Sequence, residues 1–259
     1  DSTALPKDIA FIVIEYAVMV TPLDAFLEAN VLPDLAELLP RALSLCRTDD
    51  DELLEVACFT LLGNFLSGTA AQTQTIWDEL HALDLIARMN MTSAQCTEAA
   101  VRAMCNAIGA MRSSHVVLHA GGFLRALLPP LREAALAHKD VWQARCRLLS
   151  SLMTYTHPVD MQLLWEAHVV EELVHAIANG HDKGCHLEEW LPTEGITRAV
   201  CWLTAGGQPK ALQLRECRRL FGAADSYAQS FSLVTSMMSQ VHAPPVRRNL
   251  ETLLAALRG

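Results

Sequence analysis

The fold of this chain is decided by the stretch QCTEAAVRAMCNAIGA at residues 95–110. Its apolar residues recur at intervals of three and four, which is typical of a helix with one wide apolar face. Two other stretches repeat this pattern, LLEVACFTLLGNFLSG at 53–68 and DVWQARCRLLSSLMTY at 140–155, and only Arg145 breaks it. When the three copies are aligned on Asn64, Asn106 and Ser151, they lie 42 and 45 residues apart. A period of this length indicates stacked helical units.

Shorter helical patterns precede each copy, so each unit is predicted to contain three helices. The predicted helices lie at 22–30 and 31–45 before the first copy, 72–80 and 82–90 before the second, and 114–120 and 123–137 before the third. A weaker fourth copy at 194–207 follows predicted helices at 159–168 and 169–178 and an inserted loop at 179–194. Three helices in 42–45 residues is the armadillo period.

Two motifs resemble the armadillo repeat family of importin-α and β-catenin. EANVLPDLAELL at 28–39 is similar to the start of the family's second helix, and EAAVRAMCNAI at 98–108 is similar to its third. The resemblance covers residues 8–207 and implies an all-α, right-handed α-solenoid of about four armadillo-type three-helix repeats with helical caps. The expected parts are an N-terminal capping helix or partial repeat at 1–21, repeats at 22–68, 69–112, 113–156 and 157–207, and a divergent C-terminal helical cap at 208–259.

Composition excludes several classes of protein. With 51% hydrophobic and 19% charged residues the chain is not disordered, and its net charge of −9 argues against general nucleic-acid binding. The most apolar run, at 9–20, contains Glu15 and is shorter than the roughly 20 residues of a bilayer span, so we expect a buried helix there and no membrane span. Eight cysteines without a C-x-x-C pair favour reduced thiols in an intracellular protein. We expect a cytoplasmic location, and because the sequence starts at Asp1, an organellar location after removal of a targeting segment stays open.

No catalytic motif occurs, since G-x-G-x-x-G, G-x-x-x-x-G-K-[ST], G-x-S-x-G and H-E-x-x-H are all absent from the sequence. We therefore expect no enzyme activity and no cofactor. The predicted loop holds His181, Cys185 and His186, with His175 just before it, but their spacing matches no standard zinc site, so no metal site is expected. The acidic run at 49–52 is predicted to cap the helix that follows, with a negative surface for a basic partner as the alternative.

The candidate binding residues are polar pairs on the third helices, which line the concave groove in armadillo proteins. Two residues four apart share one helix face, and the pairs are Thr60/Asn64, Arg102/Asn106, Arg147/Ser151 and, in the weak copy, Cys201/Ala205. The likeness to importin-α implies Trp at the earlier position of each pair, and this chain has none there. Two arginines would repel a polybasic peptide, so nuclear-signal binding is not expected. Asn can donate and accept hydrogen bonds with an extended backbone, and Arg can bind a carboxylate with two parallel bonds.

The resemblance implies a non-catalytic adaptor or scaffold whose groove binds an extended segment or a helix of a partner protein, with acidic groups among its side chains. Two alternatives stay open for the function, an Hsp70 nucleotide-exchange co-chaperone and a structural subunit of a large organelle or cytoskeletal assembly. For the polar pairs themselves the alternative is an ordinary solvated face.

Overall fold

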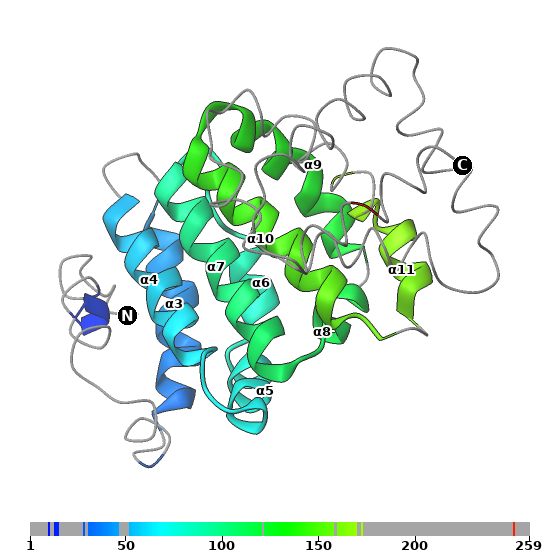
Figure 1. Ribbon diagram of the computed structural model, residues 1–259. Coiled ribbons are helices and arrows are strands. Elements are labelled where there is room, and N and C mark those ends of the chain that lie inside the picture. Colours follow the sequence, from blue (N-terminus) through cyan, green and yellow to red (C-terminus); the bar gives the residue numbers. More distant parts are fainter. Residues whose placement is uncertain are drawn as a thin grey trace. The chain divides into compact units, whose positions relative to one another are not determined.

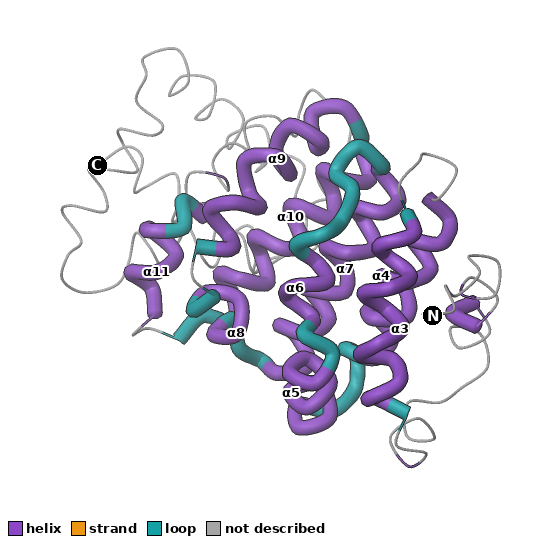
Figure 2. Tube along the Cα trace, turned by 180° about the vertical axis from the view of Figure 1, so that it is seen from behind, coloured by secondary structure: helices purple, strands orange, loops and turns teal. Residues whose placement is uncertain are grey.

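A computed structural model gives the fold (Figures 1 and 2). It describes residues 10, 13–15, 28, 31–46, 52–120, 122–157, 160–169, 172 and 251. The chain divides into two compact units, residues 1–148 and 149–259. Every described element is a helix, and the described residues contain no strand. None of these helices is both long and apolar enough to cross a membrane.

The described helices follow the predicted order along the chain. The three copies of the apolar pattern form α4 (Glu52–Phe65), α7 (Ala94–Met111) and α10 (Lys139–Tyr155), which continues from the first unit into the second. The shorter helices are α3 (Leu32–Leu45), α5 (Ala70–Glu79), α6 (Ala82–Ile86), α8 (His115–Leu118), α9 (Phe123–Ala137) and, in the second unit, α11 (Met161–Glu166).

Other predicted parts fall wholly or almost wholly outside the described residues. They are the N-terminal cap at 1–21, the helix at 22–30, the helix at 169–178, the loop at 179–194 with its histidines and Cys185, the fourth copy at 194–207 and the C-terminal cap at 208–259.

Helix α8 covers only part of the predicted 114–120, and α6 is also shorter than its sequence predicts. The pattern predicted a helix over 82–90, but α6 ends at Ile86 and turns follow it. The Asn90 N–H donates to Glu55 Oε1 at 2.6 Å instead of to a carbonyl of its own helix. After the turns that follow α6, the backbone therefore binds the neighbouring repeat.

The apolar faces of α4 and α7 form the centre of the first unit, and these two helices lie side by side in Figures 1 and 2. Their packing is more extensive than that of any other helix pair among the described residues. Every residue of the two apolar stripes is at most 3% exposed, so the predicted helix phase is correct. These residues are Leu54, Ala57, Cys58, Leu61, Leu62, Phe65 and Leu66 in the first copy, and Cys96, Ala99, Ala100, Ala103, Met104, Ala107 and Ile108 in the second.

Small residues let the two helices approach closely at one point. Gly63 of α4 faces Ala103 of α7, and a Cβ placed on Gly63 would lie 3.4 Å from the Ala103 Cα and 3.5 Å from its Cβ. A methyl group would just reach contact there, and a larger side chain would push the helices apart. Gly109, near the end of α7, has nothing within 4 Å of its own Cβ position.

Two carboxylates join the start of α4 to the segment before α7. Glu55 is 5% exposed and accepts the Asn90 N–H, and Glu52 Oε1 accepts the Ser93 hydroxyl at 2.6 Å. Ser93 is also the N-cap of α7, because its Oγ accepts the Cys96 N–H at 3.0 Å. Of the acidic run, 49–51 lie outside the described residues, and Glu52 begins α4 and has a partner inside the protein.

The third copy buries a charged residue where the others bury small ones. Arg145, the position that breaks the apolar pattern, is 1% exposed and corresponds to Cys58 and Ala100. Its residue type suggests an exposed position, but the phase of α10 places it on the buried face.

The glycine contact predicts unequal effects of one substitution at two sites. Gly63→Val should lower the free energy of unfolding by about 1–3 kcal/mol, because its methyl groups would overlap Ala103. Gly109→Val, the matched change in open space, should stay within about 0.5 kcal/mol of wild type. Urea unfolding midpoints measure both, and equal losses would contradict the close approach.

The buried thiols of Cys58 in α4 and Cys96 in α7 should be chemically inert in the folded protein. Burial raises the pKa of Cys58 and of Cys96, and the nearby Glu55 carboxylate raises both further. The thiolate is the reactive form of a cysteine. A thiol with a raised pKa contains little thiolate even at a pH close to the ordinary thiol pKa of about 8.5. With an alkylating reagent at pH 8–9, peptide mapping should show labelling of the half-buried Cys46 and Cys105 before these two and the buried Cys146. Equal native rates for all five would contradict the core assignment.

Candidate partner-binding site

The candidate site is the set of polar residues on the third helices. We call six residues the polar row: Thr60, Asn64, Arg102, Asn106, Arg147 and Ser151. The apolar stripes of α4 and α7 are buried, and the residues of the polar row lie outside these stripes. All six are described, and none belongs to the buried core.

On α4 the row offers a carboxamide open to solvent. Asn64 is exposed and Thr60, one turn earlier, is half-buried. The Asn64 backbone carbonyl accepts the N–H and the hydroxyl of Ser67, at 3.3 and 2.6 Å, which ends the helix. Its side chain makes no hydrogen bond to any described residue and keeps both a donor and an acceptor for a ligand.

On α7 the equivalent asparagine has a structural partner. Asn106 is half-buried, and its Nδ2 donates to the Gly63 carbonyl oxygen at 2.9 Å. The last carbonyls of a helix lack an intrahelical partner, and Gly63 is among them because the Ser67 N–H bonds to Asn64 instead. Asn106 therefore caps the end of α4 from the next repeat. Sequence reasoning missed this role, and the only sequence signal for it is the glycine directly before the anchor position.

Arg102 is the exposed charge of the α7 row. Among the described residues it has no ion-pair partner, and it lies one turn before Asn106 on the same face. Glu98, one turn earlier again, is half-buried. The guanidinium therefore has its full set of donors available, next to the helix pair that Asn106 fixes.

On α10 the row consists of Arg147 and Ser151, one turn apart. Arg147 is exposed and has no ion-pair partner among the described residues, and Ser151 is half-buried. The boundary between the two units falls between these residues, at Leu148 and Leu149. The structure thus joins Asn106 of the α7 pair to Gly63, the residue directly before Asn64, and the α10 pair lies along its own helix.

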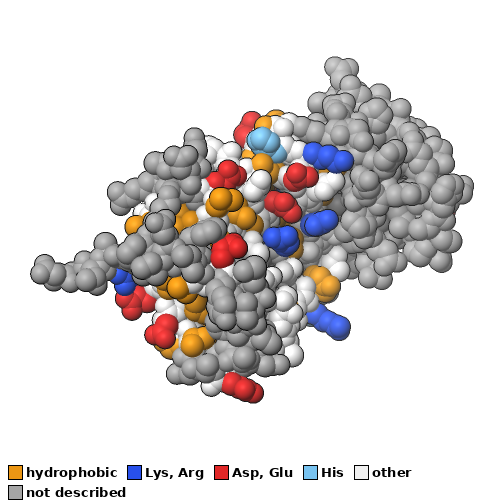
Figure 3. Space-filling view, turned by 90° about the vertical axis from the view of Figure 1, so that its left-hand side faces the viewer, with side chains coloured by type: hydrophobic (Ala, Val, Ile, Leu, Met, Phe, Trp, Pro, Cys, Tyr) orange, Lys and Arg blue, Asp and Glu red, His pale blue; other side chains and the backbone are white. Residues whose placement is uncertain are grey.

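On the described part of one face (Figure 3), the charges do not form one large patch of a single sign. Figure 3 shows acidic and basic side chains interspersed with apolar ones on the described part of one face. At ordinary salt, dissolved ions largely screen the interaction of exposed charges that are more than about 10 Å apart. A charge such as that of Arg102 therefore acts mainly at short range.

The sequence matches no family model and no curated protein. Solved structures do match, over almost the whole chain. A designed armadillo repeat protein in complex with the peptide (KR)4 has a TM-score of 0.61 at 17% identity, with 99% of this chain and 95% of that chain covered. A second designed armadillo repeat protein also has a TM-score of 0.61 at 17% identity, over 97% and 92% of the two chains. An engineered protein has a TM-score of 0.57 at 19% identity, over 100% and 94%.

At these identities the likeness shows the fold alone. It agrees with the all-helical order of the described elements. The chain has an all-α fold of armadillo-type repeats.

Proposed function

We propose that this chain is a non-catalytic adaptor that binds an extended segment of a partner protein along the polar row. Armadillo-type solenoids are commonly protein-binding scaffolds, because stacked repeats present one long surface. The observation that carries the proposal is the pair Asn64 and Arg102. Both side chains are exposed, have no described partner and sit on two helices that are packed tightly together.

The spacing of these helices suits a peptide backbone. Packed helices lie about 8–10 Å apart, and an extended chain rises about 3.3 Å per residue. Neighbouring repeats would therefore contact positions two or three residues apart in the bound segment. The Asn64 carboxamide would exchange hydrogen bonds with the backbone of that segment, and such bonds give affinity without demanding a particular side chain.

Arg102 and Arg147 would set the charge preference of the partner. The designed armadillo protein to which this chain is similar is in complex with the basic peptide (KR)4. In this chain the exposed arginines favour carboxylates, each of which can accept two parallel N–H bonds. The partner segment is therefore expected to be extended and to carry Asp or Glu at alternate positions.

Charge reversal tests this preference. A fluorescent peptide of alternating Glu and Ser should bind the wild type better than (KR)4, and added salt should weaken its binding. Arg102→Glu should weaken binding of the acidic peptide by about tenfold or more, since a charge-assisted hydrogen bond contributes about 1.5–3 kcal/mol. The matched control is Arg88→Glu, an exposed arginine after α6 and outside the row. Fluorescence anisotropy gives the affinities, and equal losses in both variants would show non-specific attraction and reject the proposed site.

Alanine substitutions at the two asparagines should affect different properties, peptide affinity at Asn64 and the unfolding free energy at Asn106. Asn64→Ala should weaken peptide binding while its unfolding free energy stays within about 0.5 kcal/mol of wild type. Asn106→Ala should lower the unfolding free energy by about 1–3 kcal/mol, because the buried Gly63 carbonyl loses its donor. Thermal melts and anisotropy on the same samples distinguish the effects. If Asn64→Ala left affinity unchanged for every peptide that the wild type binds, the row on α4 would not be part of the site.

A further inference from the structure

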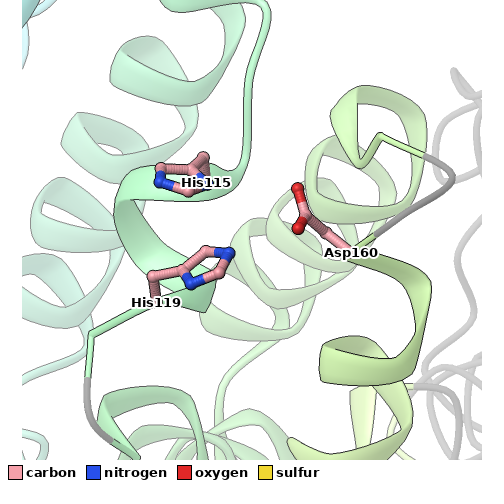
Figure 4. A group of neighbouring side chains, drawn as sticks. All are labelled: His115, His119 and Asp160. Carbon is pink, nitrogen blue, oxygen red and sulfur yellow. The ribbon is translucent and has the colours of Figure 1, made fainter.

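A pair of histidines lies on one turn of α8, away from the polar row on α4 and α7. His115 and His119 are four residues apart, both are exposed, and their ring centroids are 3.9 Å apart (Figure 4). The third labelled residue in that view, Asp160, precedes α11 and belongs to the second unit. The spacing places both imidazoles on the same side of the helix.

The protein core holds this turn in place. Val117, between the two histidines, is 1% exposed, and Ser114, the N-cap of α8, is equally buried. The His119 N–H donates to the His115 carbonyl at 3.0 Å, so the helical turn is complete through both residues. The His115 N–H in turn bonds to Ser113 Oγ at 3.2 Å. Because the apolar side of the turn is buried, both rings stay on its solvent side.

The rings are close enough to share a metal ion. Their candidate ligand nitrogens lie within 4.8 Å of each other. Two imidazoles bound to one ion at about 2.0–2.1 Å each have their nitrogens up to about 4 Å apart, so a small side-chain rotation suffices. We infer that His115 and His119 form a two-histidine chelate for a divalent transition metal such as Zn²⁺ or Ni²⁺, with solvent in the remaining positions.

The ligand type selects the metal. Imidazole nitrogen suits zinc, nickel and copper, whereas Mg²⁺ and Ca²⁺ prefer oxygen. Among the described residues, the cysteines of α4 and α7 do not join any such group of ligands. The site is therefore a surface site built from nitrogen donors. Open positions on the metal make binding reversible, and they leave room for a further donor.

Nickel titration of the full chain tests this inference, after removal of bound metal with a chelator. Bound Ni²⁺ is paramagnetic, so it should broaden the ring signals of His115 and His119 first among the ten histidines of the chain. His115→Gln and His119→Gln keep a hydrogen-bonding side chain at each exposed position. Each should weaken nickel binding, measured by calorimetry, by about tenfold or more, equivalent to about 1.4 kcal/mol or more. The matched control is His138→Gln, an exposed histidine that follows α9 and has no histidine one turn away.

The outcomes decide the inference in either direction. Selective broadening of two ring signals, lost in the two Gln variants and kept in His138→Gln, supports the chelate. The metal-dependent rise in melting temperature should disappear in the same two variants, because only the folded turn holds both rings in place. The inference fails if wild type does not bind nickel, if broadening spreads evenly over all histidines, or if either Gln variant keeps the wild-type affinity.

Discussion

The close contact between Gly63 and Ala103 is the constraint on which the rest of the first unit depends. It sets how near α4 and α7 lie, and with that distance it sets which groups can reach across the seam. At this separation the short Asn106 side chain reaches the Gly63 carbonyl, at 2.9 Å. The apolar stripes could pack at several separations, since hydrophobic burial is not directional. The small residues and the hydrogen bond together select one of them.

Two asparagines that look equivalent in the sequence, Asn64 and Asn106, have different surroundings in the structure. The Asn106 side chain donates a hydrogen bond to the Gly63 carbonyl near the end of α4, so it is held in place, and it is half-buried. Asn64 keeps its whole carboxamide for solvent or a ligand. Asparagines at equivalent positions of neighbouring repeats can therefore differ: one is fixed by a hydrogen bond within the protein, and the other is available to a ligand. In the proposed function, the fixed members maintain the spacing of the surface and the available members make the contacts.

Much of the fold follows from the sequence because helix phase is local. The 3.6-residue period predicted the buried faces of α4 and α7 residue by residue. Three features could not be predicted in this way, because each depends on a partner in another repeat. Glu55 is buried against a backbone N–H 35 residues away, the chain after the early end of α6 binds that carboxylate through Asn90, and Asn106 binds a carbonyl 43 residues away. Arg145 shows the same limit, since its residue type suggests the surface and its helix phase buries it.

The polar bonds between α4 and the following repeat have one further consequence, for how the chain folds. They join residues 35, 41 and 43 positions apart, so each spans about one repeat and none spans the chain. The entropy of closing these loops is therefore set by the repeat length and would not grow if more repeats were added. Proteins whose contacts are this local fold by forming one neighbouring pair and extending from it. The pair α4 and α7, with its carboxylate ties at one end and its amide cap at the other, has what such a nucleus requires.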